Sequence, residues 1–196
     1  MNFIVFEGID GCGKTTQSKK LVKYLNKLGL NVIWTREPGG SLLAEKLREI
    51  ILNDVLDPEM ELILMLISRI DHINNFIIPN LKKGNIVVCD RFTDSTIAYQ
   101  KYGRGLKFDS VIVNELMLKT LEIKPDITFV MDISPESALS RVKDPNIFEK
   151  SGIDFYKRVR DAFIMLSKRP LHKLINCESK SIDEVFDEVV ENLNLV

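Results

Sequence analysis

The sequence predicts an α/β fold in which helices cover both faces of a parallel sheet. Short apolar runs alternate with segments of helical periodicity along the chain, and the first run leads into a glycine-rich turn. Alternation of this kind is typical of right-handed strand–helix–strand crossovers. The 196 residues, 45% of them hydrophobic, are enough for one well-developed core. We therefore expect a single domain, residues 1–196, with at most a small mobile appendage.

Five apolar runs have the length and composition of buried parallel strands. Each is flanked by segments with helical spacing, as expected where helices cover both faces of a sheet. The runs lie at residues 3–7, 31–35, 85–90, 127–133 and 172–176. The sequence therefore predicts a five-stranded sheet.

Helix boundaries are marked by capping residues. Segment 14–28 has leucine and valine side chains at helical spacing and stops at Gly29, a common C-terminal residue. Three further helices are expected to begin at N-caps, two of them followed by proline and one completed by a glutamate as a capping box. These N-caps are Asp57, Ser134 and Ser181. The helix after Asp57 is expected to continue through about Arg69 or beyond.

A glycine-rich turn joins the first predicted strand to the first predicted helix. Residues 8–15 match the pattern G-x-x-x-x-G-K-[ST] in full. Glycines let backbone N–H groups turn inward, and the following helix adds its positive dipole end. Lys14 can reach the β- and γ-phosphates, and Thr15 can hold Mg²⁺. The turn predicts a nucleotide-phosphate site on a P-loop NTPase-type three-layer α/β fold.

An aspartate ends the third apolar run. Asp90 lies where phosphate-loop proteins carry an acidic residue that supports the metal directly or through water. An N-capping role for Asp90 is the alternative. Arg91 comes next, at the edge of the sheet where ligands bind in such folds. The pair predicts a metal and anion site facing the glycine-rich turn.

Composition limits the partners that the chain can have. Its 27 basic and 28 acidic side chains nearly balance, which argues against a dedicated nucleic-acid binder. Three separated cysteines and two histidines suit neither a disulfide framework nor a zinc site, and free thiols fit a reducing cytoplasm. The N-terminus has no basic leader, and no run approaches the ~18 apolar residues of a membrane span. We expect a cytoplasmic protein with no nucleic-acid or membrane partner.

Four segments, in order along the chain, resemble the thymidylate kinases. They read FEGIDGCGKTTQ at 6–17, REPGG at 36–40, DRF at 90–92 and STIAYQ at 95–100. Many kinases share the first segment, whereas the second and fourth are much more specific. The resemblance covers nearly the whole chain. It implies a homodimeric nucleoside-monophosphate kinase with a five-stranded parallel sheet and a lid at about 142–153, which transfers the γ-phosphoryl group of ATP to dTMP with Mg²⁺ for dTTP synthesis.

The resemblance also implies roles for individual residues. The ATP-binding positions are Gly8, Ile9, Asp10, Gly11, Cys12, Gly13, Lys14, Thr15, Thr16 and Arg141. The dTMP-binding positions are Arg36, Glu37, Pro38, Met65, Arg69, Arg91, Ser95, Thr96, Tyr99 and Gln100. The catalytic positions are Lys14, Arg91, Asp90 and Asp10, and the metal-binding positions are Thr15 and Asp90.

Within the dTMP set, the two phosphate-binding residues are Arg36 and Arg91, because guanidinium groups fit phosphate oxygens well. By the same resemblance Arg69 bonds the base, Gln100 reads the thymine edge, and Tyr99 lies against the sugar. The alternatives are a surface ion pair for Arg36 and an ordinary packed aromatic for Tyr99.

Three further residues each have two interpretations. Asp10 is expected either near the sugar 3′-hydroxyl or as a turn-stabilising residue. Arg104 belongs either to a substrate loop or to a solvent-exposed one. Cys12 is expected to be a small loop side chain rather than a redox switch, although a helix N-terminus can lower the pKa of a thiol.

Two positions depart from the family pattern. Met65 stands where many relatives carry a phenylalanine that stacks on thymine, which leaves Phe92 or Phe76 as other candidates to cover the base. Ile147 stands where relatives carry a lid arginine, and Gly11 is not an arginine either. Another cation should then substitute. The candidates are Lys143, which we prefer, and Arg141, Lys150, Arg158 and Arg160.

Three other functions compete with this interpretation. Another nucleoside-monophosphate kinase with an altered base pocket would share the phosphate site and differ in its acceptor. A weakly active regulatory paralogue is an alternative because of the lid departure. A GTP-dependent switch protein is disfavoured, since the sequence has no Asn-Lys-x-Asp segment.

Overall fold

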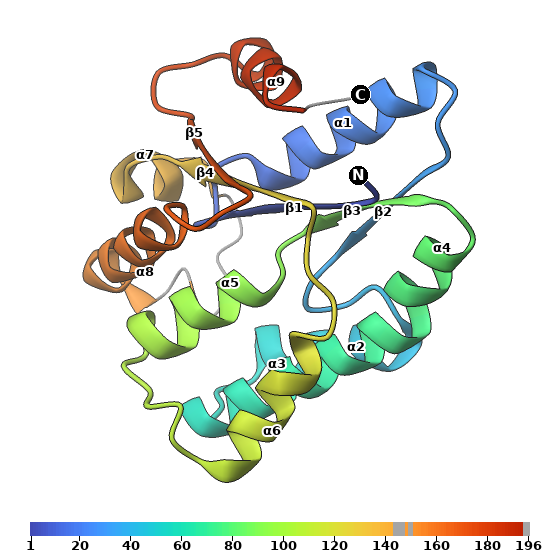
Figure 1. Cartoon of the computed structure of the whole chain (residues 1–196). Helices are drawn as coiled ribbons and strands as arrows, with labels where there is room; N and C mark the ends of the chain where they lie inside the picture. The colour runs from blue at the N-terminus through green and yellow to red at the C-terminus, as the bar shows by residue number, and fades with distance from the viewer. Residues whose placement is uncertain (143–147, 149–150, 194–196) are drawn as a thin grey trace.

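A parallel five-stranded sheet forms the centre of the computed structural model, which describes residues 1–142, 148 and 151–193 (Figure 1). The strands are β1 (Phe3–Gly8), β2 (Val32–Arg36), β3 (Ile86–Asp90), β4 (Ile127–Asp132) and β5 (His172–Asn176). Their order is β2-β3-β1-β4-β5, and every neighbouring pair is parallel. All five predicted strands are confirmed, and their ends agree to within one residue.

Helices cover both faces of this sheet, which confirms the predicted fold class. The helices are α1 (Lys14–Lys27), α2 (Leu42–Asn53), α3 (Pro58–His72), α4 (Ile78–Lys82), α5 (Thr93–Thr96), α6 (Val111–Thr120), α7 (Pro135–Ser140), α8 (Ile153–Leu166) and α9 (Ile182–Glu191), with π-helical segments η1 (Ile73–Ile77) and η2 (Ile97–Gly103). In Figure 1, α1 and α9 lie above the sheet, and α4, α5 and α8 lie below it.

The alternation of side chains along β1 divides the core between the two faces. Phe3 and Val5 pack with Ile77 of η1, whereas Ile4 and Phe6 belong to the larger cluster that includes the buried leucines of α1. Successive strand residues point to opposite faces, so each face receives an apolar row. The sheet is therefore buried on both sides, and its ligand-binding edge is left to the loops.

The long helix predicted after Asp57 continues beyond Arg69, as the sequence allowed. Asp57 caps it by accepting the Glu59 N–H at 2.9 Å, and α3 continues through η1 and α4 as one helix, Pro58–Lys82. By length and composition alone this helix could cross a membrane, although charged residues interrupt it and it holds no run of about 18 apolar residues. Some of its apolar side chains, including Leu62 and Leu66, are buried against the protein, as in a core helix, whereas Met60 and Ile67 are exposed. It is weak evidence for a membrane span.

Candidate active site

A cavity of about 740 Å³ opens where β1, β2 and β3 end. All ten predicted dTMP-binding residues line it, together with Asp90 and the predicted ATP-binding residues other than Gly8 and Ile9. The motifs are far apart in sequence, but parallel strands bring their carboxyl ends to one edge. The cavity has the size of a site for small organic ligands.

The glycine-rich turn needs glycine for steric reasons at Gly11. This residue has φ 81°, and a Cβ there would lie 2.1 Å from the carbonyl oxygen of Ala138. An arginine could not replace Gly11 unless α7 moved, which explains why the turn does not supply the cation missing from the lid. Lys14 is buried and donates from Nζ to the Ile9 carbonyl oxygen at 2.8 Å. The turn thus holds its lysine close to the inward-facing backbone.

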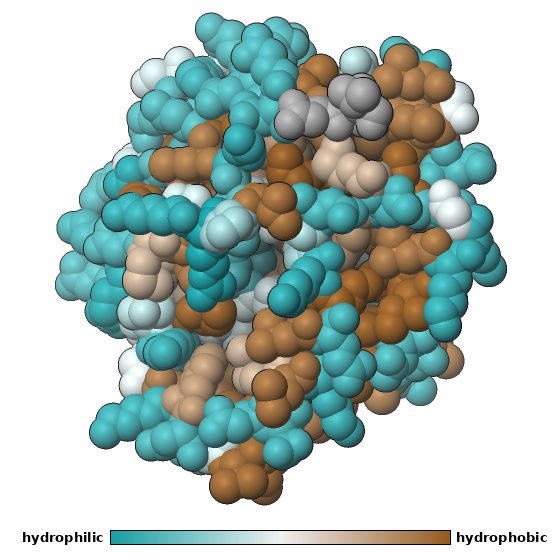
Figure 2. Space-filling view, viewed as in Figure 1, coloured by the Kyte–Doolittle hydropathy of each residue, from teal (hydrophilic) through white to brown (hydrophobic). Residues whose placement is uncertain are grey.

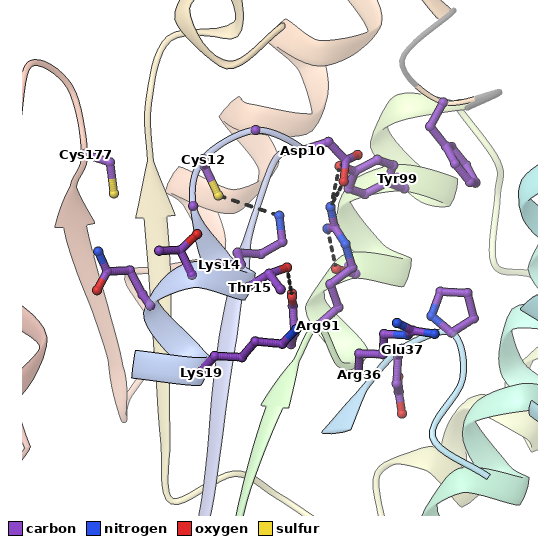
Figure 3. Close-up of a pocket in the computed structure, with 18 of the residues that line it drawn as sticks. Asp10, Cys12, Lys14, Thr15, Lys19, Arg36, Glu37, Arg91, Tyr99 and Cys177 are labelled. Atoms are coloured by element: carbon purple, nitrogen blue, oxygen red, sulfur yellow. Dashed lines mark hydrogen bonds and ion pairs between the residues drawn. The ribbon is translucent and has the colours of Figure 1, made fainter. Parts of the chain in front are cut away.

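Asp10 is the centre of a polar cluster facing the cavity. It pairs with Arg91 and accepts hydrogen bonds from the hydroxyls of Tyr99 (2.7 Å) and Tyr156 (2.9 Å), as Figure 3 shows for the first two. Burial alone would raise the pKa of Asp10, but Arg91 and Lys14 together with the two hydroxyls hold it well below its usual range. Asp10 is therefore ionised at neutral pH and orients Arg91.

Arg91 adopts a backbone conformation that is costly for a residue with a side chain. Its φ is 75°, in the left-handed region, where strain is of the order of 1–3 kcal/mol. The side chain turns back to donate to the Gly8 carbonyl oxygen at 2.9 Å and the Ser95 hydroxyl at 3.1 Å. Such strain is tolerated where the surrounding contacts fix it, and here it holds a guanidinium beside the glycine-rich turn.

The residues predicted to bind metal lie together. The hydroxyl of Thr15 donates to the carboxylate of Asp90. A dashed line at the labelled Thr15 in Figure 3 marks this bond. Among the described residues there is no cluster of three or more histidine, cysteine, aspartate or glutamate side chains that could hold a metal alone. A hydroxyl and one carboxylate fit Mg²⁺, which takes its other ligands from phosphate oxygens and water.

Two guanidinium groups lie on the other side of the cavity. Arg36 pairs with Glu45 at 3.1 Å, so the alternative of a surface ion pair is also present, but its Nε is buried and has no partner among the described residues. Arg48 on α2 donates to the Pro38 carbonyl oxygen at 2.7 Å and was missed by sequence reasoning. Burial and the neighbouring Arg36 lower the pKa of Arg48. With Arg91, these cations make the cavity suited to an anion.

Arg69 is fixed by three acceptors. Its guanidinium donates to Glu37 at 2.6 Å, to the Thr96 hydroxyl at 2.8 Å and to the Phe92 carbonyl oxygen at 2.9 Å. The other oxygen of Glu37 lies 2.9 Å from the ring of His72. Burial would raise the pKa of Glu37, but Arg69 and His72 lower it on balance. The peptide bond between Glu37 and Pro38 is cis.

Neither Phe92 nor Phe76, the two aromatic residues that the sequence suggested as covers for the base, lies at the cavity. Phe92 packs edge-to-face on Phe3 and Phe76 lies against His72, and neither lines the cavity, so both candidates are wrong. The lining instead includes Met65 and Phe148, whose ring lies edge-on to Tyr99 at 5.6 Å. The orientation of Phe92 and Phe76 is set by the core and not by the ligand site.

The structure excludes two of the five candidates for the cation that would substitute for the lid arginine of the family. Arg158 donates to the Gly103 carbonyl oxygen and Arg160 pairs with Asp132, and neither lines the cavity, which removes both. Arg141 does line it. The remaining positions, Lys143, Ile147 and Lys150, lie outside the described residues.

The far end of the cavity is formed by the segment before α9. Gln17 donates to the Ile182 carbonyl oxygen at 2.9 Å, while its own Oε1 is buried without a partner among the described residues. Cys12 and Cys177 also line this end, and burial raises the pKa of both thiols, that of Cys177 to about 12. The burial and raised pKa of Cys12 favour a small loop side chain over a redox switch.

Replacing Glu7 by glutamine is expected to stabilise the protein above neutral pH. Glu7 is fully buried and accepts from the Phe92 and Ser95 backbone N–H groups and the Ser95 hydroxyl. Burial and the nearby Asp94 raise its pKa to about 7. The folded pKa is above the unfolded one, so stability is lost as pH rises from about 4.5 through 7.

Thermal unfolding at about pH 5 and pH 8 measures this effect. The glutamine variant should have a Tm about 3 °C or more above that of the unmodified protein at pH 8 and no advantage at pH 5. The exposed Glu122→Gln is the matched control and should give no pH-dependent difference. If the Tm of the Glu7→Gln variant and that of the unmodified protein changed with pH in the same way, the raised pKa of Glu7 would be contradicted.

Comparison with known proteins agrees with the resemblance drawn from the four sequence segments. The sequence profile described as "Thymidylate kinase" matches residues 6–189. A thymidylate kinase of Wolbachia pipientis (strain wPip) is 44% identical over 195 residues, which cover 96% of this chain and 94% of the relative. The crystal structure of thymidylate kinase from Ehrlichia chaffeensis is 38% identical with a TM-score of 0.79, and the match covers 98% of each chain. The chain therefore belongs to the thymidylate kinase family and catalyses the ATP-dependent phosphorylation of dTMP.

Proposed function

We propose that the residues around the cavity carry out this transfer by bringing two anions together and screening their repulsion. The phosphate of dTMP is already a nucleophile near neutral pH, so no strong general base is needed. The observation that carries the proposal is the convergence of Lys14, Arg36, Arg48 and Arg91 on one cavity beside the glycine-rich turn. Arg36 and Arg91 hold the acceptor phosphate, and Arg48 adds a third guanidinium group to the lining of the cavity.

On the donor side, the N–H groups of the glycine-rich turn hold the ATP phosphates, and Lys14 exchanges the Ile9 carbonyl for phosphate oxygens. Support comes from its position on the turn and its burial. Arg141 lies against adenine, and Asp10 keeps Arg91 aimed at the acceptor. Residues 1–196 form one domain, in which about 142–153 serve as the lid.

Mg²⁺ is the proposed metal, held by Thr15 and Asp90. Their contact and the donor chemistry of one hydroxyl and one carboxylate support this assignment. When bound, Mg²⁺ neutralises charge on the β- and γ-phosphates.

The acceptor is tested by offering purified protein dTMP, dUMP, CMP, GMP and AMP with ATP and Mg²⁺. We expect dTMP to give the highest kcat/KM. Preference for another monophosphate would favour the kinase with an altered base pocket. A single-turnover measurement distinguishes an active kinase from a weakly active regulatory paralogue. The paralogue would bind both nucleotides but transfer almost no phosphoryl group.

A homodimer through α3 and α6 is the proposed assembly. In Figure 2, apolar side chains gather over the region where Figure 1 draws these helices. Exposed apolar residues there and on the adjoining α2 end include Val55, Met60, Val111, Ile112 and Leu118. Apolar patches of this kind mark interaction sites, and a two-fold interface would bury the same patch on both copies.

Ile112→Glu is expected to convert the dimer to a monomer, because it introduces a charge into the exposed apolar patch that the proposed interface would bury. Light scattering after size exclusion should give about half the mass of the unmodified protein. Leu28→Glu, at an exposed apolar position on the end of α1, is the control and should leave the mass unchanged. An Ile112→Glu protein of unchanged mass would place the interface elsewhere.

We also propose a cytoplasmic location with no nucleic-acid or membrane partner. The balanced charge of the chain and its three buried free cysteines support this assignment.

A further inference from the structure

Glu61 is a buried acidic residue next to the base end of the cavity. It lies on α3, is 1% exposed, and does not line the cavity itself. Its carboxylate accepts a hydrogen bond from Nε2 of Gln100 at 2.8 Å and pairs with Arg104 at 2.9 Å. Gln100 does line the cavity. Glu61 thus contacts the ligand site only through another side chain.

The bond to Glu61 fixes which end of the Gln100 amide faces the cavity. An ionised carboxylate can only accept hydrogen bonds, whereas an amide has a donor end and an acceptor end. Glu61 therefore requires the NH₂ end, which leaves the carbonyl oxygen for a ligand. Within residues 1–142, 148 and 151–193, Oε1 of Gln100 has no hydrogen-bond donor. The site presents a pure acceptor at this point.

Arg104 pairs with Glu61 and is itself held in place. Its guanidinium lies over the rings of Phe148 and Phe155, at 5.4 and 5.2 Å, and Nη1 is 3.4 Å from the Ser151 hydroxyl. These contacts come from α8 and the segment before it. Arg104 is therefore neither a free loop charge nor a direct ligand group, but the counter-ion of Glu61.

We propose that Glu61 is the positioning residue that sets base selectivity, by locking Gln100 with its oxygen toward the acceptor base. Thymine and uracil carry an N–H at N3 that can donate to this oxygen. The N3 of cytosine is an acceptor, which would face Oε1 with no proton between them. Burying two unpaired acceptors against each other should disfavour cytosine by about tenfold or more. The inference rests on the proposed role of Gln100 at the base edge.

Glu61→Gln tests the inference, because glutamine can donate as well as accept and so lets the Gln100 amide turn over. We expect KM for dTMP to rise about tenfold with a smaller change in kcat, and the ratio of kcat/KM for dCMP to that for dTMP to rise about tenfold or more. The dUMP to dTMP ratio should not change, since both bases carry the N3–H. Glu59→Gln, exposed on the same helix, is the matched control.

A reciprocal swap, Glu61→Gln with Gln100→Glu, provides the rescue. The new glutamine donates to the new carboxylate, which again presents only an acceptor to the base, so preference for dTMP over dCMP should return. A folded Glu61→Gln protein with unchanged dCMP to dTMP ratio would overturn the inference and leave Glu61 a structural residue. If the Glu61→Gln protein does not fold, the double variant provides the test. A preference of the double variant for dTMP over dCMP supports the inference, and the loss of that preference overturns it.

Failure of this inference is separable from failure of the proposed acceptor site. Unmodified protein that does not prefer dTMP would refute the assignment of the acceptor itself. Unmodified protein that prefers dTMP, beside a folded Glu61→Gln variant with the same selectivity, would refute only the role of Glu61.

Discussion

Lys14→Ala is expected to lower kcat by about 10³-fold or more, comparable with the loss of other cations that stabilise a transferring phosphoryl group. The ammonium of Lys14 is held on the glycine-rich turn 2.8 Å from the Ile9 carbonyl oxygen, within reach of the phosphates that the turn cradles. Substitution removes the charge where negative charge develops during transfer. A coupled assay for ADP at saturating dTMP measures the effect.

Folding must be separated from chemistry in this experiment. Among the residues that the structure describes, the side chain of Lys14 makes hydrogen bonds only to Ile9 and Cys12 of its own loop. The alanine variant should therefore keep its fold and a Tm close to that of the unmodified protein. Lys23→Ala, at an exposed position on the same helix, should retain full activity. Near-normal turnover of a folded Lys14→Ala protein would contradict the role of this lysine.

Arg91→Ala is expected to lower kcat/KM for dTMP by about 10²- to 10³-fold, through both a higher KM and a lower kcat. The same guanidinium is proposed to bind the acceptor phosphate and to align it for attack, so binding and chemistry should fall together. Arg91 also keeps Asp10 ionised, because its charge is the largest effect that lowers the pKa of that carboxyl.

Titration of dTMP at fixed ATP separates these effects. Arg91→Lys should recover part of the kcat but little of the KM, because an ammonium cannot bind phosphate oxygens in pairs. If Arg91→Ala leaves the dependence on dTMP concentration unchanged, the acceptor phosphate does not contact this residue. KM for ATP should change far less than KM for dTMP.

The strands and most helix starts could be predicted because they depend on local sequence. Apolar runs defined all five strands, and the N-cap residues Ser134 and Ser181 accept the hydrogen bonds expected of them. How far the helix continues past Arg69 could not be predicted in the same way. Proline at position 79 favours a helix end before it, whereas the chain passes through a π-helical segment and continues to Lys82.

The phosphate site could be predicted from the sequence, whereas several other residues in and around the cavity could not. The glycine-rich turn has a fixed spacing within eight residues, so its sequence alone specifies its geometry. Arg48, Glu61 and His72 reach the site only through packing between α2, α3 and β2, and in the sequence they look like ordinary residues of amphipathic helices. The error on Phe92 and Phe76 has the same origin, because tertiary packing decides where an aromatic ring points.

A crystal structure with dTMP and a non-hydrolysable ATP analogue tests the central claim most directly. We predict that the dTMP phosphate bonds to both Arg36 and Arg91 and faces the terminal phosphate of the analogue above the glycine-rich turn. A dTMP phosphate bound out of reach of both arginines would contradict the claim.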